Sequence, residues 1–434
     1  MTRPRFSIVI PTRNRAMELH HTLRTCLGQV LRDPVRDTFE IVVGDNDSTE
    51  DIRGVVEAFQ SPLIRYVRAP GYLPMVRSWE FSVEQARGEY VGIVCTDDAL
   101  LLDGLQAISD ALAAADAPVV TYQHAYYYWP SYGRPELRRQ LLVPSFVFAE
   151  GVQDAETLID EALRTLYYGR LPCFLNSFCR RDILDAARER AGTLFGSLCP
   201  DIYAGFLLAA LSGKVHVLNR VVGVGGVSGS STGGTAQLDP LGAASLAYMQ
   251  EYKDEPFLPG LMAFPFTASA ILDSAVKALN RLGRGLSIAD VLQPGPYAEY
   301  CYRQAMLYPS PAREQGCAAV QAFIASQPDG GRTIARRLQL RRLQWWLKDS
   351  TIAGAFQWRF LWVGIKGAII GLLALGAGMG IVHLINQRLE GALLPQLLPP
   401  PEVLASLLVL PIVAGLLTML TARFAVMRAL SDMN

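Results

Sequence analysis

The chain has 434 residues, enough for two or three domains. Hydrophobic residues make up 50% and the mean hydropathy is +0.20, which is high for a soluble enzyme. The 40 basic and 40 acidic residues give a formal net charge of zero, so no overall basic field favours nucleic acid as a partner. Seven scattered cysteines, without CxxC or zinc-ligand spacing, predict reduced thiols in a cytosolic compartment. We expect no signal peptide, because the N-terminus leads straight into the first predicted strand.

Predicted strands and helices alternate over the first hundred residues. Apolar runs predict strands at residues 6–10, 39–43, 64–67 and 90–94. The helical spacing of apolar residues predicts helices at residues 18–31 and 76–86. A third predicted helix ends at Phe59, with Ser48 or Thr49 as its N-cap. This alternation implies parallel βαβ units.

Polar residues follow three of these strands. Pro11 and Thr12 follow the first strand, Asp45 the second, and the adjacent pair Asp97 and Asp98 the fourth. Open α/β sheets bind ligands at the carboxyl ends of their strands, and carboxylates suit Mg²⁺ or Mn²⁺ that accompany a substrate's phosphates. We therefore expect a phosphate and nucleotide pocket at this edge of the sheet. Taken alone, an adjacent Asp pair is more often a solvated turn or a helix cap.

Three sequence blocks carry a family resemblance: IVIPTRNR, then EIVVGDNDSTED, then ARGEYVGIVCTDDALL. In this order and spacing they resemble the family 2 glycosyltransferases with the GT-A fold, over roughly residues 5–230. The resemblance implies an α/β fold, with a Rossmann-like nucleotide-binding domain and a mixed sheet at residues 1–235. It also implies inverting transfer of a sugar from a nucleotide donor, and we expect a UDP-sugar.

The resemblance also assigns roles to individual residues. Asp45 would contact the nucleobase, or be an ordinary turn residue. Thr96-Asp97-Asp98 resembles the metal-binding DxD element, with Asp98 as the chief ligand of Mn²⁺ or Mg²⁺ and Asp97 as a second ligand or a contact to the ribose. The metal would neutralise charge on the departing diphosphate. The residues expected to bind the nucleotide sugar are Pro11, Thr12, Arg13, Arg15, Asp45, Arg77 and Asp97. Arg13 and Arg15 could reach the diphosphate or be solvated.

Asp201 is the candidate catalytic base. An inverting transfer needs a carboxylate or imidazole that accepts the proton of the acceptor hydroxyl. Pro200 and Asp201 suit the start of a helix at residues 202–211, where Asp201 would also serve as an N-cap. The position resembles the late acidic motif of the family, although the chain has Pro-Asp where many relatives have Glu-Asp.

Two further segments have open interpretations. Residues 221–234 are rich in Gly and Ser, which predicts a mobile loop or a lid whose Ser228, Ser230 or Ser231 contacts the diphosphate. The aromatic run at residues 122–129 would stack on sugar rings or line a core or interface. His124 and His216 are isolated, and we interpret His216 as structural.

The C-terminal third predicts a membrane anchor. After a helical region at residues 236–335, we expect an amphipathic interfacial helix at 336–359 and two transmembrane helices at 360–386 and 402–427. Buried core helices are the alternative. Basic residues crowd the outer flanks, so the positive-inside rule places the catalytic domain on the cytoplasmic side of the inner membrane, in contact with membrane lipids. A stripe of small residues from Gly367 to Gly378 suits close packing within the hairpin or in a homo-oligomer.

The sequence leaves four functions in competition. The first is a membrane-anchored inverting glycosyltransferase acting on a hydroxyl of a glycan or lipid-linked acceptor. The second is a polyprenyl-phosphate glycosyltransferase, whose anionic acceptor would make Asp201 dispensable. The third is a processive polysaccharide synthase, but Gln339-Leu340-Arg341-Arg342-Leu343 lacks the Trp of its Gln-x-x-Arg-Trp motif. The fourth is a non-catalytic nucleotide-sugar-binding scaffold on the membrane.

Overall fold

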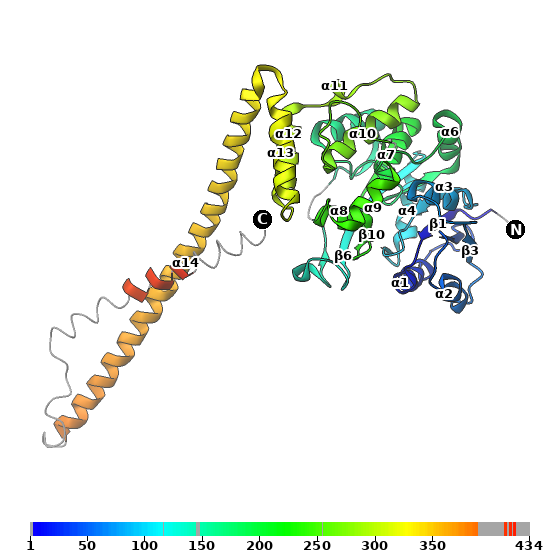
Figure 1. Cartoon of the computed structure of the whole chain (residues 1–434). Helices are drawn as coiled ribbons and strands as arrows, with labels where there is room; N and C mark the ends of the chain where they lie inside the picture. Colours follow the sequence, from blue (N-terminus) through cyan, green and yellow to red (C-terminus); the bar gives the residue numbers. More distant parts are fainter. Residues whose placement is uncertain are drawn as a thin grey trace. The chain divides into compact units, whose positions relative to one another are not determined.

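The structure is a computed structural model that describes residues 3–115, 117–144, 148–253, 255–388, 412–414, 416–418 and 420–421. It divides into two compact units, Met1–Gly331 and Arg332–Asn434 (Figure 1). The first unit contains a β-sheet covered by helices. The second unit contains one long helix, α14 (Arg332–Arg388).

A single mixed sheet organises the first unit. In the described part of the chain its order is β3-β2-β1-β4-β9-β6-β10-β5, with β7 beside β6 and β8 beside β10. Neighbours among β1 to β4 pair in parallel, whereas β9 is antiparallel to both β4 and β6. The strands are β1 (Phe6–Thr12), β2 (Phe39–Asp45), β3 (Ile64–Arg68), β4 (Tyr90–Ile93), β5 (Ala99–Leu100), β6 (Val119–Tyr128), β7 (Leu141–Leu142), β8 (Gly151–Asp154), β9 (Ser177–Arg180) and β10 (Lys214–Val227). The predicted mixed α/β sheet is confirmed.

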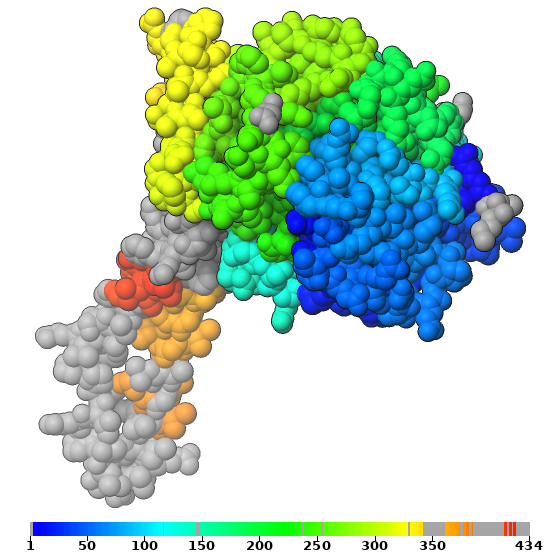
Figure 2. Space-filling model, turned by 45° about the vertical axis from the view of Figure 1, so that its right-hand side comes forward, coloured from blue at the N-terminus to red at the C-terminus, as the bar shows by residue number. Residues whose placement is uncertain are grey.

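Helices α1, α2 and α3 each follow one of the parallel strands β1, β2 and β3, and further helices follow the last strand, β10, along the chain. They are α1 (Ala16–Leu27), α2 (Ile52–Ala58), α3 (Met75–Glu84), α4 (Gly104–Ala114), α5 (Ala155–Thr165), α6 (Arg181–Ala191), α7 (Pro200–Ser212), α8 (Thr232–Leu238), α9 (Ala243–Glu251), α10 (Thr267–Arg281), α11 (Ile288–Val291), α12 (Pro294–Met306) and α13 (Ala312–Ala325). Residues 236–331 belong to the same compact unit as the sheet. In the space-filling view, surface residues of the N-terminal segment (blue) lie beside surface residues of the green segment that includes α8 to α10 (Figure 2).

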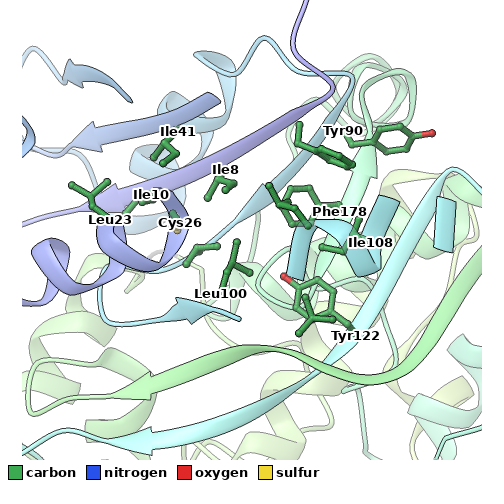
Figure 3. Close-up of a cluster of buried hydrophobic side chains, with 14 of the residues drawn as sticks. Ile8, Ile10, Leu23, Cys26, Ile41, Tyr90, Leu100, Ile108, Tyr122 and Phe178 are labelled. Carbon is green, nitrogen blue, oxygen red and sulfur yellow. The ribbon is translucent and has the colours of Figure 1, made fainter. Parts of the chain in front are cut away.

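The core lies around the central strand β1, whose seven residues are all buried. Ile8 and Ile10 of β1 and Ile41 of β2 pack against Leu23 of α1, and Phe178 of β9 extends the cluster (Figure 3). Burying such a side chain stabilises the fold by about 1.5–3 kcal/mol. Because helices cover a parallel sheet on both faces, even the polar residues Ser7 and Thr12 of β1 are buried, on either side of the apolar run Ile8 to Ile10.

Two predicted helix boundaries are wrong. Helix α1 ends at Leu27, followed by Gly28 as its C-cap, so it does not continue to Leu31. Helix α2 is capped by Asp51, whose Oδ1 accepts a hydrogen bond of 2.8 Å from the Gly54 N–H. The residues predicted as its cap are engaged elsewhere, because the Thr49 N–H donates to Asn14 Oδ1 at 2.7 Å.

The loop predicted for residues 221–234 is also wrong over most of its length. Residues up to Val227 belong to β10, which pairs in parallel with β6 as far as Tyr128. Ser231 then caps α8 by accepting a hydrogen bond from the Gly234 N–H. The Gly and Ser content did not predict this part of β10, because pairing with neighbouring strands stabilises it rather than its own composition.

The C-terminal helix α14 includes the predicted interfacial segment 336–359 and the predicted span 360–386. Among the described residues, no helix combines the length and apolar character needed to cross a bilayer. The second predicted span, 402–427, lies mostly outside the described residues. The predicted membrane hairpin is therefore not supported by the helices that the structure describes.

Candidate active site at the carboxyl ends of the parallel strands

The turn after β4 is fixed by threonine side chains. Thr96 is buried, and its Oγ1 donates a 2.8 Å hydrogen bond to the carbonyl oxygen of Pro11 in β1. Thr22 of α1 places its Oγ1 2.6 Å from the Thr96 carbonyl oxygen and 2.7 Å from that of Asp98. Thr96, which stands where the DxD pattern has an acid, therefore ties the carboxylate-bearing turn to the central strand.

Asp98 is held by two backbone amides. Its Oδ2 accepts from the Cys95 N–H at 3.0 Å, and its Oδ1 accepts from the Gly226 N–H at 2.8 Å. Burial, and next the charge of Asp97, raise the pKa of Asp98 to about 7, against a smaller opposing effect of the amides. The two amides therefore fix the orientation of this carboxyl, while burial and Asp97 raise the free energy of its ionised form.

Asp97 contacts the loop after β1 and the residue that follows β10. Its Oδ1 pairs with Arg15 Nη1 at 3.3 Å, and its Oδ2 accepts from Ser228 Oγ at 2.7 Å. The indole Nε1 of Trp129 donates to the Asp97 carbonyl oxygen at 3.0 Å. The buried Asp97 side chain thus connects the loop after β1 to the end of β10 through hydrogen bonds.

Gly226 was missed by sequence reasoning. A Cβ at this position would lie 1.8 Å from the Asp97 carbonyl oxygen and 2.8 Å from Trp129 Nε1. Only glycine lets β10 approach the turn closely enough for the amide of residue 226 to reach Asp98. A glycine inside a strand pattern is a signal for such a close backbone approach.

The predicted diphosphate residues separate in space. Arg15 stays at the carboxylates and also donates to the Ser230 carbonyl oxygen. Arg13 instead stacks its guanidinium 4.2 Å from the ring centre of Tyr72. Arg77 is exposed on α3, without a hydrogen bond or ion pair to the described part of the chain. Thr12 is buried at the end of β1, and its Oγ1 has no hydrogen-bond partner there.

Asp45 lies at the predicted strand end and is fully buried. Its Oδ1 accepts from the Ser48 N–H at 3.0 Å. Its Oδ2 accepts from Tyr66 Oη at 2.6 Å and from Arg68 Nη1 at 2.9 Å. The predicted nucleobase residue is therefore already bound to side chains of β3.

Asp201 is the second residue of α7, after Pro200. The N-cap is Cys199, so the interpretation of Asp201 as the cap is wrong. Burial raises the pKa of Asp201 to about 6, and the backbone N–H groups at the helix start offset part of that rise. Burial, and next the charges of Asp98 and Asp97, raise the pKa of the Cys95 thiol well above its usual value.

The aromatic run divides between core and surface. Tyr122 is buried in the core cluster, whereas Tyr126, further along β6, is 49% exposed. Between them, His124 packs its ring 5.4 Å from that of Tyr122, and burial lowers its pKa to about 4. Neutral His124 therefore has a packing role. His216 is likewise buried, with its pKa lowered mainly by burial.

A divalent cation fits this site only together with ligands from a substrate. Among the described residues, no three His, Cys, Asp or Glu side chains converge as a metal site. Asp97 pairs with Arg15, while the Gly226 N–H orients the carboxylate of Asp98. This donor set suits Mg²⁺ or Mn²⁺ that is completed by phosphate oxygens and water.

Comparison with known proteins agrees with this geometry. The model of "Glycosyl transferase family 2" matches residues 7–167, a little over a third of the chain. That segment includes Asp45, Asp97 and Asp98, while Asp201 lies beyond it. Residues 7–167 are therefore similar to the family 2 glycosyltransferases, and the chain is a glycosyltransferase by that similarity.

Two named relatives share part of the chain. The GalNAc(5)-diNAcBac-PP-undecaprenol beta-1,3-glucosyltransferase of Campylobacter jejuni is 29% identical over 108 residues, which are 24% of this chain and 33% of that protein. The validoxylamine A glucosyltransferase of Streptomyces hygroscopicus is 34% identical over 154 residues, 35% of each chain. The chain thus spans about a third of the length of the curated relatives it matches.

Similar solved structures include S. aureus TarS with UDP-GlcNAc. It has a TM-score of 0.44 and 17% identity, over 78% of this chain and 92% of that chain. Another is the mannosyltransferase PcManGT of Pyrobaculum calidifontis with GDP-Man and Mn²⁺. It has a TM-score of 0.39 and 18% identity, over 75% of this chain and 87% of that chain.

Proposed function

We propose that the chain is an inverting glycosyltransferase. It moves a sugar from a nucleotide-sugar donor to a hydroxyl of a glycan or lipid-linked acceptor, on the cytoplasmic face of the membrane. The observation that carries the proposal is the carboxylate turn after β4, where the amides of Cys95 and Gly226 orient Asp98 and Arg15 pairs with Asp97. Asp201, at the start of α7, supplies the proposed base.

In the proposed reaction, Asp201 accepts the proton of the acceptor hydroxyl. The hydroxyl oxygen forms the new bond to the anomeric carbon, on the face opposite the diphosphate, and the electron pair of the broken bond leaves with the diphosphate. A carboxyl with a pKa of about 6 is ionised near neutral pH and is still basic enough to accept that proton. Arg15 faces the negative charge that develops on the leaving group, and it sits beside the Asp97 carboxylate.

A divalent cation held by Asp98 and Asp97 would add Lewis-acid stabilisation of the departing diphosphate. The orientation of Asp98 by the amides of Cys95 and Gly226 supports this assignment. Asp97, which is hydrogen-bonded to Arg15 and Ser228, would add a second negative charge next to the cation.

The acceptor class is supported by one relative. The C. jejuni protein is named for an acceptor linked to undecaprenol through a diphosphate, which favours a lipid-linked glycan here as well. Membrane anchoring through residues 360–386 and 402–427 rests on their apolar sequence and remains part of the proposal. An enzyme at the bilayer would meet such an acceptor directly.

Donor turnover by the full chain, purified in detergent, tests the proposal. Wild type is assayed with UDP-, GDP- and dTDP-sugars, with Mn²⁺, with Mg²⁺ and with EDTA, beside Asp98→Ala and Asp201→Asn. We expect one donor class to be turned over, and both variants to lose at least about a hundredfold in rate. The surface variant Asp182→Asn is the control and keeps full activity.

Other outcomes separate the alternatives. Full transfer to a polyprenyl phosphate by Asp201→Asn would identify a polyprenyl-phosphate glycosyltransferase, because an anionic acceptor needs no base. Donor binding without turnover under any condition would identify a non-catalytic scaffold. Activity that survives EDTA would remove the metal from the proposal.

A further inference from the structure

An apolar groove lies between α9 and α13, on residues that the proposed reaction does not use. It has a volume of about 360 Å³ and is lined by Leu246 and Met249 of α9, by the loop at residues 263–265 and by Ala319 of α13. Of the described residues that line it, only Gln315 has a polar side chain. Ligand sites of about 300–1,000 Å³ have mainly apolar walls with a few polar groups. The groove suits an apolar chain better than a sugar, whose hydroxyls would find little to bind there.

Two arginines are hydrogen-bonded to the backbone beside the groove. Phe264, which lines the groove, packs its ring 6.0 Å from that of Tyr308. The Tyr308 carbonyl oxygen accepts from Arg313 Nε at 3.0 Å, and the Leu307 carbonyl oxygen accepts from Arg134 Nη2 at 3.3 Å. In the part of the chain that the structure describes, neither arginine forms an ion pair. Each guanidinium therefore keeps most of its five N–H donors for an anion.

Two acidic side chains in the same region are already hydrogen-bonded. Asp239 precedes α9, and its Oδ1 accepts from the N–H of the groove residue Leu241 at 3.1 Å. Glu314 follows Arg313 on α13, and both of its carboxylate oxygens lie 2.9 Å from Ser310 Oγ. The two arginines outweigh the single charge of Glu314, and this positive balance favours a ligand that carries phosphate.

The segment after β6 connects Arg134 to the carboxylate turn. Trp129 donates from its indole Nε1 to the Asp97 carbonyl oxygen at 3.0 Å, and Arg134 follows Trp129 closely in the chain. The intervening residues span at most about 18 Å, even when fully extended. A short glycan whose diphosphate is held at Arg134 would bridge that distance to the turn.

Helix α9 connects the groove to the proposed base. Met249 lines the groove, while its neighbour Tyr248 donates a 2.7 Å hydrogen bond from its hydroxyl to the Leu198 carbonyl oxygen. Leu198 lies in the loop that leads to Asp201 at the start of α7. One wall of the groove is therefore fixed against the loop that carries the proposed base.

We propose that this groove holds the isoprenoid chain of a lipid-linked acceptor, and that Arg134 and Arg313 bind its diphosphate. The inference rests on the proposed function and names the acceptor class, an isoprenyl diphosphate that carries the glycan. Leu246 is 49% exposed, so an isoprenoid chain that covers it removes apolar surface from water. The glycan extends from the diphosphate toward the carboxyl ends of the strands.

Photoaffinity labelling of the full chain in detergent tests the proposal. The probe is geranyl diphosphate with a benzophenone at the end of its apolar chain, and mass spectrometry identifies the labelled peptides. We expect labels in α9 and α13. Farnesyl diphosphate in excess should suppress them at least about tenfold, whereas pyrophosphate and farnesol at the same concentration should compete less, since each supplies only one of the two linked contacts.

Two variants with matched controls assign the contacts. Leu246→Asp should lower labelling at least about tenfold, because the isoprenoid chain would bury an unpaired carboxylate. Leu102→Asp is its control, since Leu102 is 61% exposed outside the groove, and it should label as wild type does. Arg313→Ala should lower labelling about tenfold through the loss of charge-assisted hydrogen bonds, whereas Arg190→Ala, an exposed position on α6, should not.

Three results would overturn the inference. One is labelling outside α9 and α13, or labelling that farnesyl diphosphate does not suppress. Another is equal labelling of Leu246→Asp and wild type. The third is a wild-type dimer that Leu246→Asp dissociates, without labels in the groove, which would assign the groove to a second copy of the chain.

Donor turnover by the same preparations separates this inference from the proposed function. Turnover of a donor without labels in the groove would overturn the inference and leave the proposed function intact. Labels in the groove without turnover of any donor would support the isoprenyl diphosphate site and overturn the proposed function.

Discussion

Ser228 donates a 2.7 Å hydrogen bond from its Oγ to Oδ2 of Asp97, although 131 residues separate them in the chain. Both side chains are buried, so water cannot replace the bond without rearrangement. The contact joins the end of β10 to the turn after β4 and holds the carboxylate pair in place. Parallel pairing of β10 with β6 makes the approach possible.

Ser228→Ala should therefore weaken both stability and activity. It leaves one buried oxygen of Asp97 without its donor, which costs about 1–3 kcal/mol of unfolding free energy. We expect a lower melting temperature and a rise of about tenfold in the KM for the donor, measured by calorimetry and steady-state kinetics. Ser245→Ala is the control, because Ser245 is also buried but donates to the Asp239 carbonyl oxygen. A donor KM equal to that of wild type would contradict a role for Ser228 in the site.

Gly226→Ala should be more damaging than its size suggests. The added Cβ would meet the Asp97 carbonyl oxygen at 1.8 Å, so either β10 or the carboxylate turn must shift. A shift would break the hydrogen bond from the Gly226 N–H to Asp98, and such overpacking costs about 1–3 kcal/mol. We expect turnover to fall at least about a hundredfold.

Gly233→Ala is the matched control for that substitution. A Cβ at Gly233 meets nothing within 4 Å, and the residue lies in α8, where alanine is the better helix former. Its activity should be unchanged and its stability equal or slightly higher. Equal activity of the two alanine variants would show that close approach at Gly226 is dispensable.

The ends of β1, β2 and β4 were predictable because most of their residues are buried and form mainly apolar runs, unlike the partly buried β3. The position of Asp97 and Asp98 at the end of β4 follows directly from that pattern, as does Asp45 at the end of β2. The hydrogen-bond partners of these side chains could not be predicted from the sequence pattern. The partners of Asp97 come from β10 and from the loop after β1, which only the sheet order brings together.

Two errors have specific physical causes. Ser48 and Thr49 suit a helix cap by residue type, but Asn14 and Asp45 recruit their amides, and Asp51 caps α2 instead. The ion pair between Arg68 and Asp45 depends on the register between β2 and β3, which places the two residues opposite each other. Neither a propensity nor a motif encodes that register.

Asp201→Asn should affect activity and stability in opposite directions. The folded pKa of Asp201, about 6, is above its usual value of 3.8, because burial penalises the ionised form. The protonated carboxyl therefore contributes stability that is fully present below about pH 4 and is lost as the pH rises through 6. At pH 8, Asp201→Asn should abolish transfer yet unfold at a higher temperature than wild type, and the difference should shrink toward pH 4.

The pH profile of wild type follows from the same shift. The rate of transfer should fall on the acid side with an apparent pKa near 6, because only the ionised carboxylate accepts a proton. Asp182→Asn serves as the stability control, since the bond to Arg180 lowers the pKa of Asp182. That variant should lose a little stability at pH 8. An Asp201→Asn variant less stable than wild type at pH 8 would show that the buried charge is well compensated.

Arg15→Ala should weaken donor binding more than catalysis. Arg15 pairs with Asp97 and donates to the Ser230 carbonyl oxygen, so its loss leaves two adjacent carboxyls without a nearby guanidinium. Their repulsion of the donor diphosphate should raise KM about tenfold or more. Arg15→Lys should recover part of that loss through its charge alone.

Kinetics in donor, with Arg32→Ala beside the Arg15 variants, measure this effect. Arg32 is the control because its exposed side chain pairs with Asp110, away from the carboxylate turn. Higher ionic strength should reduce the difference between wild type and Arg15→Ala, since salt screens the charges that act on the incoming diphosphate. An unchanged donor KM in Arg15→Ala would place the diphosphate away from Asp97, and Arg13 or Arg77 would then be the residue to vary.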